Sequence, residues 1–412
     1  MSRIFRRSFW LPALALVGLA FWLSPCTPPR TLRRPPDPQV APIPELPHRV
    51  WVLLTAIEQQ DSMKVRTAGS EEPLTFRFEK HEIHGSDGRV GRMLDLAPRA
   101  PFEINGRQYL GDLKVQVHER GGLRALVHVD LEHYVEGVVA AELPLWSSLP
   151  AELEAQAICV RTYTMTALQR LGLGADGFLW DGVQDQAFHG NYVPGESSGE
   201  QAAAARLRRA VEATRGQVLL EGEGLLDVRY HAACGGHTAD RATIFPGTRT
   251  SRTVDCEPCM ERARAEAGTP ADRRPLTWTL RLSKPECLVL VDRFRLGTRL
   301  LRLAPSKLDA WGRWQTVRLV GDRRAADVPL DLMRKHVGYG RLKSGRILSV
   351  EPSTGAPTAD GLTLVGVGRG HGVGLCQEGI HDYAARGMSS QAILEHYYPG
   401  TRVERLPVNP RY

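Results

Sequence analysis

A carboxyl at the end of an expected helix is the first candidate for chemistry in this sequence. Glu142 follows the helical pattern of residues 131–141 and precedes Leu143 and Pro144, with Trp146 close behind. Because proline ends a helix, we expect Glu142 at the helix terminus among apolar side chains. Partial desolvation there would raise the pKa of the carboxyl and keep it protonated for acid catalysis. The alternative is a solvated helix-end charge, which the local sequence alone favours.

Cysteine spacing defines a second candidate site. Cys234-Gly-Gly-His237 and Cys256-Glu-Pro-Cys259 each separate two ligands by two residues. Such gaps let one turn present two ligands to a tetrahedral ion, and three cysteines with one histidine form a known zinc set. With four protein ligands the site would be closed and structural. Disulfide bonds are the alternative, because an exported chain meets an oxidising environment.

A glycine-rich segment, residues 366–374, contains His371 and precedes Gln377. Alternating glycines let a backbone bend tightly and approach another chain closely. No Gly-Lys-Ser/Thr follows, which argues against a nucleotide site. A cysteine hydrolase built on Cys376 and His371 would need an exposed thiolate of low pKa. Cys376 and Cys159 instead lie in apolar segments, which is typical of core residues.

The elements that must position these residues predict an α+β fold. Residues 50–129 have short alternating strands with hairpin signals at Asn105-Gly106 and Gly121-Gly122, so this part should be a β-rich layer. Helices are predicted over residues 131–141, from about 150 to 171, and over 199–213. Strands follow at 218–220 and 228–231. Between 276 and 367 strand-prone segments return, with a helical piece at 329–337.

The N-terminus predicts export. Arg3, Arg6 and Arg7 precede an apolar run over residues 9–23, which is typical of a signal peptide or an uncleaved signal anchor over residues 1–24. Nine prolines between residues 25 and 47 predict a stiff linker over 25–48. We therefore expect a β-rich part over 49–130 and a catalytic body over 131–412. The protein should lie in the periplasm or cell envelope, in contact with a membrane only through an uncleaved N-terminus.

The composition of the 412 residues is that of a soluble globular protein, with 42% hydrophobic and 24% charged residues. The net charge is +7, but six arginines fall within the first 34 residues. The remaining body is nearly neutral, so the charge gives no reason to expect a nucleic-acid partner.

Several separated segments, taken in order, resemble the stage II sporulation protein D and amidase-enhancer (SpoIID/LytB) family. The similarity spans about residues 118–402, and ordered motifs are far more specific than any single one. The segments are 133–144 with 155–163, Asp185-Gln186, 231–238, 366–377 and 393–401.

This resemblance implies a peptidoglycan lytic transglycosylase that cleaves glycan strands stripped of peptides, with Glu142 as its single acid and base. Ordinary glycoside hydrolysis uses two carboxylates. The resemblance also implies a zinc site and a substrate groove between two lobes, with Arg161, Asp185, Gln186, His371 and Gln377 as groove candidates. For Arg161 a buried salt bridge is the alternative. A non-catalytic murein-binding activator of a cell-wall amidase is the alternative function.

Overall fold

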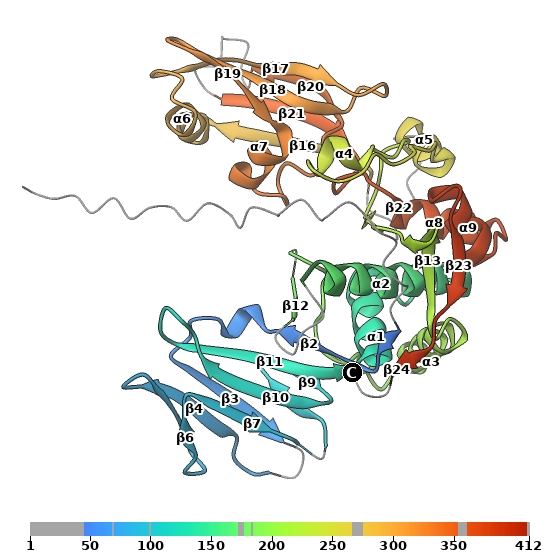
Figure 1. The fold of residues 1–412 in the computed structure, drawn as a ribbon. Coiled ribbons are helices and arrows are strands. Elements are labelled where there is room, and N and C mark those ends of the chain that lie inside the picture. The colour runs from blue at the N-terminus through green and yellow to red at the C-terminus, as the bar shows by residue number, and fades with distance from the viewer. Residues whose placement is uncertain are drawn as a thin grey trace, which may run out of the picture. The chain divides into compact units, whose positions relative to one another are not determined.

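The computed structural model describes residues 45–67, 70–98, 100–171, 177–182, 184–265, 275–352 and 361–409, all within one compact unit (Figure 1). The predicted signal segment and the linker up to residue 44 lie outside the described residues and stay predictions. Within the described ranges, no helix combines the length and apolar character needed to cross a membrane. Helices and strands are both abundant, as the α+β prediction requires.

The first part of the body is built from strands. Their bounds are β2 Arg49–Leu53, β3 Ser62–Thr67, β4 Leu74–Glu79, β5 Glu82–Gly85, β6 Val90–Gly91, β7 Met93–Leu96, β8 Phe102–Ile104, β9 Arg107–Tyr109, β10 Asp112–Val117, β11 Leu123–Asp130 and β12 Leu179–Trp180, with a short 3-10 turn at Thr55–Ile57. They form a six-stranded sheet, β6-β5-β4-β3-β8-β9, and a five-stranded sheet, β12-β2-β11-β10-β7. Asn105 and Gly106 join β8 to β9 with φ of 50° and 76°, the left-handed conformations that a tight hairpin requires.

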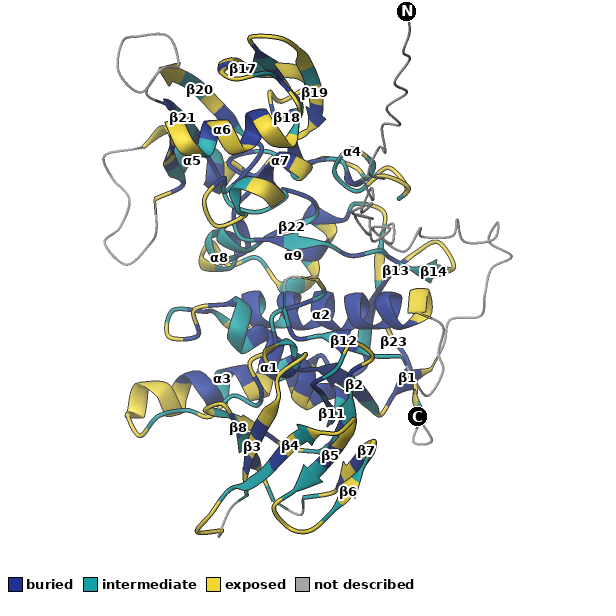
Figure 2. Ribbon diagram, turned by 90° about the vertical axis from the view of Figure 1, so that its left-hand side faces the viewer, coloured by how far each residue is buried: buried dark blue, intermediate teal, exposed yellow. Residues whose placement is uncertain are grey.

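Three helices follow and pack on one another: α1 Leu131–Glu142, α2 Pro150–Leu171 and α3 Ser198–Ala213. The Asp130 side chain caps α1 by accepting the N–H groups of Glu132 and His133. Leu143 is extended and Pro144 follows, so α1 ends at Glu142 as the sequence predicts. Figure 2 shows α2 buried along most of its length. This helix contributes side chains to two hydrophobic cores and joins them.

A second group of short elements packs on α2 and carries most of the cysteines. Its bounds are β13 Gln217–Glu221, β14 Gly224–Leu225, β15 Tyr230–His231, α4 Arg241–Ile244, α5 Glu257–Arg264, β22 Leu375–Cys376, α8 Gln377–Ala385, α9 Ser390–Tyr397 and β23 Arg402–Arg405. Strands β14, β13 and β23 form one sheet, and β15 pairs in parallel with β22. This pairing brings residues 230–231 beside residues 375–376.

Residues 276–367 contain a third core between two three-stranded sheets and two helices. The elements are β16 Thr277–Ser283, α6 Lys284–Arg293, β17 Leu300–Leu308, β18 Trp314–Gly321, β19 Ala325–Pro329, α7 Leu330–Val337, β20 Ile347–Pro352 and β21 Gly361–Val367. The sheet orders are β16-β21-β20 and β17-β18-β19.

The N-terminal and C-terminal ends of the described chain pair with each other. Strand β1, Leu46–Pro47, lies parallel to β24, Val408–Asn409, and the Leu46 side chain is fully buried. Because burial of an apolar side chain and strand pairing both fix a chain, these residues belong to the folded body. The linker that we predicted to continue to residue 48 therefore ends before Leu46.

Candidate functional site

Glu142 lies at the C-terminal end of α1, where two donors hold its half-buried carboxyl. The side-chain Nε2 of Gln377 donates to Oε2 at 3.0 Å, and the N–H of Ala187 donates to Oε1 at 3.4 Å. Burial raises the pKa of the Glu142 carboxyl, and the hydrogen bonds from Gln377 and Ala187 oppose that rise. Gln377 is the first residue of α8, 235 positions along the chain, so this pair exists only in the folded protein.

Buried polar side chains surround this carboxyl. Gln186 is almost fully buried, and its amide donates to Tyr134 Oη at 3.3 Å and to Thr164 Oγ1 at 3.2 Å. The Tyr230 hydroxyl donates to Gln186 Oε1 at 2.9 Å. Burial raises the pKa of Tyr230 well above its usual value, and the neighbouring Glu142 charge adds to that rise. Tyr134 and Tyr230 were not among the predicted site residues, and their only signal in the sequence is that each lies within or beside a motif segment.

Asp185 acts as an acceptor that fixes the loop before Gln186. Its carboxylate accepts from the Tyr163 hydroxyl and from the N–H of Trp180, both at 2.9 Å. Since both oxygens already have partners, the role of Asp185 in this structure is to position the segment that lies against Glu142.

Arg161 lies in the core and not in a groove. Its side chain is fully buried and donates to both oxygens of Glu132, at 3.1 and 2.5 Å, and to the carbonyl of Gln217 at 3.0 Å. These bonds use the guanidinium to tie α2 to α1 and β13. The prediction of Arg161 as a groove residue is therefore wrong, and the buried salt bridge is the alternative that the structure contains.

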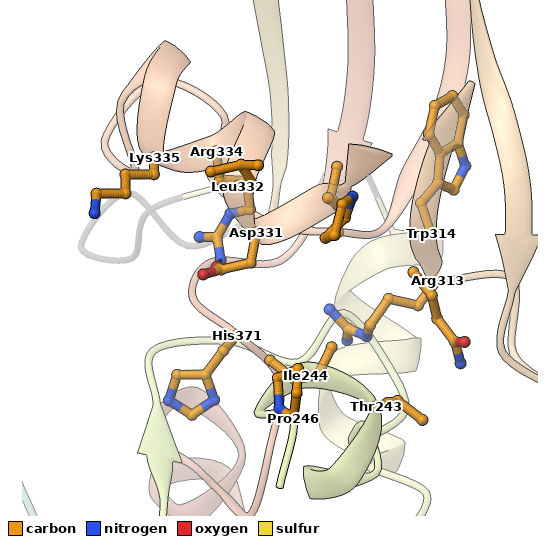
Figure 3. Close-up of a pocket in the computed structure, with 14 residues that line it drawn as sticks. Thr243, Ile244, Pro246, Arg313, Trp314, Asp331, Leu332, Arg334, Lys335 and His371 are labelled. Carbon is orange, nitrogen blue, oxygen red and sulfur yellow. Dashed lines mark ion pairs between the residues drawn. The ribbon is translucent and has the colours of Figure 1, made fainter. Parts of the chain in front are cut away.

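His371 lies in a cavity of its own, separate from the Glu142 contacts (Figure 3). The ring Nδ1 accepts the N–H of Val373 at 3.0 Å, and the ring centroid lies 5.5 Å from that of His231. Of the groove candidates, Gln377 thus contacts Glu142, Gln186 lies beside it through Tyr230, and Asp185 holds the adjoining loop. The groove between two lobes stays a prediction.

The glycine-rich loop makes the close approaches that its composition predicts. Gly368, Gly370, Gly372 and Gly374 all have φ between 70° and 93°. A Cβ on Gly374 would lie 2.1 Å from the carbonyl oxygen of Arg229, and one on Gly372 would lie 2.6 Å from the guanidinium carbon of Arg313. Glycine is therefore required both by conformation and by the space that neighbouring segments leave.

Four buried cysteine thiols gather at a second centre. The sulfur atoms of Cys234, Cys256, Cys259 and Cys376 all lie within 4.8 Å of one another. Of the four ligands predicted from spacing, Cys234, Cys256 and Cys259 lie in this cluster and His237 does not. The His237 Nδ1 instead lies 2.7 Å from Asp255 Oδ1, and its ring stacks on Trp311 with centroids 4.0 Å apart. Cys376 takes its place because the pairing of β15 with β22 brings it beside Cys234.

The donor set of this cysteine cluster suits zinc. Four thiolates in a closed arrangement are a common structural zinc site. Backbone N–H groups already point at two sulfurs, from Gly236 to Cys234 and from Cys234 to Cys376, each at 3.3 Å. Hydrogen bonds from the other three thiols hold the pKa of Cys256 far below its usual value. A bound cation would neutralise this thiolate and coordinate the three neighbouring sulfurs.

The cysteine-hydrolase alternative lacks its required nucleophile. Cys376 is fully buried, and burial raises the pKa of its thiol well above the usual value. Its sulfur contacts Cys259 at 3.5 Å and accepts from the N–H of Cys234. A reactive cysteine needs the reverse, an accessible thiol of lowered pKa.

The fold and the Glu142 site are those of an α+β protein with a desolvated carboxyl at a helix end. Residues 119–220 match the model of the SpoIID family, described as stage II sporulation protein. The matched segment contains Glu142 but not the cysteine cluster, His371 or Gln377. An uncharacterized protein of Brachyspira hyodysenteriae is similar, being 24% identical over 309 residues that cover 73% of this chain and 74% of that protein.

Proposed function

We propose that this protein is a lytic transglycosylase that cleaves peptidoglycan glycan strands lacking peptides. The observation that carries the proposal is the half-buried Glu142 carboxyl, whose pKa is raised by burial and whose orientation is fixed by Gln377. A raised pKa keeps a carboxyl protonated to higher pH, which favours its use as a general acid. The SpoIID match over residues 119–220 is consistent with a cell-wall lytic role.

One carboxyl suffices for both proton transfers in this reaction. Protonated Glu142 gives its proton to the glycosidic oxygen as the bond from that oxygen to the muramyl C1 breaks. The resulting carboxylate then accepts the proton of the muramyl C6 hydroxyl as its oxygen bonds to C1, which closes the anhydro ring and restores the acid. Gln377 donates to Oε2 at 3.0 Å, whereas Ala187 donates to Oε1 over a longer 3.4 Å, so Oε1 is the oxygen better placed to carry the proton.

Removal of the proton tests this mechanism. Glu142→Gln keeps the shape and the Gln377 contact but cannot transfer a proton, so release of anhydromuramyl products from peptide-free strands should fall at least ~100-fold. Products are measured by mass spectrometry, and folding by circular dichroism. Glu136→Gln is the matched control, because Glu136 also lies on α1 but pairs with Arg208 at 3.5 Å. Full activity of Glu142→Gln would exclude the mechanism.

The second candidate function is a non-catalytic activator of a cell-wall amidase. It predicts that the purified protein releases no anhydromuramyl product yet stimulates an amidase on intact peptidoglycan. Glu142→Gln should leave that stimulation unchanged. The feature that favours the enzyme is a carboxyl of raised pKa that Gln377 holds in one orientation, as an acid catalyst requires.

Export is part of the proposal, because peptidoglycan lies outside the cytoplasm. The basic residues before the apolar run at 9–23 are the sequence feature that supports it. Fusion of residues 1–48 to alkaline phosphatase, which folds only in an oxidising compartment, should give an active reporter. Replacing Arg3, Arg6 and Arg7 by glutamate should reduce its activity. An inactive reporter from the unchanged segment would contradict export.

We further propose that the four-cysteine cluster binds one structural zinc ion. Bound zinc would neutralise four closely spaced thiolates and tie together chain segments that are far apart in sequence. No position would be left open for a substrate. The ion therefore supports the fold around α8, from which Gln377 reaches Glu142.

A further inference from the structure

A cavity of about 260 Å³ lies where α4, α7 and the start of β18 meet the glycine-rich loop (Figure 3). Ile244, Pro246 and Leu330 contribute apolar walls, and His371 lies at its lower edge in the view of Figure 3. This volume is slightly below the range usual for drug-sized ligands, so the cavity suits one sugar or a substituent of one.

The lining of this cavity is rich in positive charge. Its lining contains three cationic side chains, Arg313, Arg334 and Lys335. Among the described lining residues the acid is Asp331. Arg313 and Arg334 are nearly fully buried, with exposed fractions of 3% and 6%. Buried charges are ordinarily paired closely with a counter-ion.

Each of the two buried guanidinium groups has one acid within 4.0 Å, and its hydrogen bonds go to backbone carbonyls. Arg313 donates to the carbonyl oxygens of Cys234 and His237, and its nearest acid, Asp309, is 4.0 Å away. Arg334 likewise donates to the carbonyls of residues 342 and 343, with Asp331 at 3.5 Å. Neutral carbonyls fix the positions of these groups without neutralising their charge, and each group has a single acid nearby.

His371 also lines this cavity, and its ring packs against His231 and Phe245. Its Nδ1 accepts the N–H of Val373, so the neutral ring carries its proton on Nε2. Burial, followed by the neighbouring His231, Arg229, Arg334 and Arg313, holds the pKa of His371 well below its usual value. The ring is therefore a hydrogen-bond donor without charge.

The cavity also lies apart from the bond that Glu142 would cleave. Tyr230 in β15 contacts Gln186 beside Glu142, whereas the next residue, His231, faces His371. Successive side chains of a strand point to opposite faces. A ligand in the cavity is thus separated from Glu142 by the β15–β22 pair and would belong to another part of the glycan.

We infer that this cavity is a secondary glycan site that binds the lactyl carboxylate of an N-acetylmuramic acid residue. This inference rests on the proposed function, since glycan strands without peptides carry that carboxylate free. The buried cations match the carboxylate, and the apolar walls match the lactyl methyl group and the sugar face. A neutral N-acetylglucosamine residue offers no partner for the cations.

Binding of the monosaccharide N-acetylmuramic acid to the full-length protein tests the inference. The affinity is followed by calorimetry, and the side-chain NMR signal of His371 is the local reporter. N-acetylmuramic acid should shift that signal, whereas N-acetylglucosamine and inorganic phosphate at equal concentration should not. Equal binding of the neutral sugar, equal binding of phosphate, or an unchanged His371 signal would each overturn the inference.

Three variants, each replacing a charged side chain by a neutral one of similar size, test the contribution of individual charges to binding. Lys335→Gln should weaken binding ~3-fold, and Asp331→Asn, which removes the competing carboxylate, should strengthen it ~3-fold. Lys307→Gln, on β17 outside the cavity, should change nothing. Opposite effects of the first two substitutions support the site, and effects in the same direction contradict it. Glycan cleavage is measured separately, so a protein that cleaves strands but does not bind the monosaccharide refutes this inference alone.

Discussion

At the scale of single residues, the burial of Glu142 raises the pKa of its carboxyl and lowers the stability of the fold when that carboxyl ionises. Two donors reach its carboxyl, but burial outweighs them and raises its pKa above the ordinary value of 4.5. Ionisation of a buried carboxyl lowers the stability of the folded state, because water solvates the charge better in the unfolded chain. The opposite balance holds at Arg161, where a close, buried acid partner compensates the charge.

The raised pKa of Glu142 gives a pH-dependent prediction. The folded state holds this proton more tightly than the unfolded state, so its contribution to stability is present below pH 4.5 and lost as pH rises through the raised folded pKa. Glu142→Gln removes the ionisation, so the variant should be more stable than the wild type by about 0.5–2 kcal/mol at pH 8. At pH 4 the two should be nearly equal. Urea unfolding at both pH values measures the difference, and a variant less stable at pH 8 would contradict the assignment.

At the scale of elements, α8 is the helix on which the two centres meet. It begins with Gln377, which contacts Glu142, directly after Cys376, which belongs to the cysteine cluster. A displacement of this helix would therefore disturb both centres together. Its close packing depends on Gly379, where a Cβ would lie 2.0 Å from Tyr397 Oη and 2.6 Å from Cys256 Sγ.

Two glycine substitutions in helices should consequently have opposite effects. Gly379→Ala overpacks the interior and should cost about 1–3 kcal/mol of stability. Gly199→Ala, in the first turn of α3, meets no atom within 4 Å and should be neutral or stabilising by up to about 1 kcal/mol. Thermal and urea unfolding of both variants provide the measurement. If Gly379→Ala were as stable as Gly199→Ala, the packing of α8 described here would be wrong.

At the scale of the whole molecule, the cysteine cluster ties distant parts of the chain to one point. Cys234 and Cys376 are 142 residues apart, and Cys259 and Cys376 are 117 apart. A metal ion at this point would close long loops, and because the site exists only in the folded chain, its binding energy becomes folding energy.

Metal analysis and unfolding together distinguish the ligand sets. Purified protein should contain close to one equivalent of zinc, and Cys376→Ser should lose it and melt several degrees earlier, as should the chelated wild type. His237→Ala should keep the metal, since its ring bonds to Asp255 outside the cluster. Reductant alone should have no effect. Destabilisation by reductant but not by chelator would identify disulfide bonds instead and leave the assignment of Glu142 untouched.

The sequence by itself determined the local features of this protein. The termination of α1 at Glu142, the Asn105-Gly106 hairpin and the need for glycine in residues 366–374 all follow from backbone sterics of neighbouring residues. Pairwise cysteine spacing likewise predicted three of the four cluster members.

Only the tertiary structure decided which distant residues meet. Local patterns carry no information on the pairing of β15 with β22, so Cys376 was assigned to the core and His237 to the metal. For the same reason the sequence could not decide between a groove position and a buried salt bridge for Arg161. The packing of α1 against α2 brings Arg161 to Glu132. The family resemblance placed Gln377 and Glu142 in the same groove but did not predict a contact between them. Its atomic form depends on long-range packing, because a side chain's partner is chosen by the fold and not by its sequence neighbours.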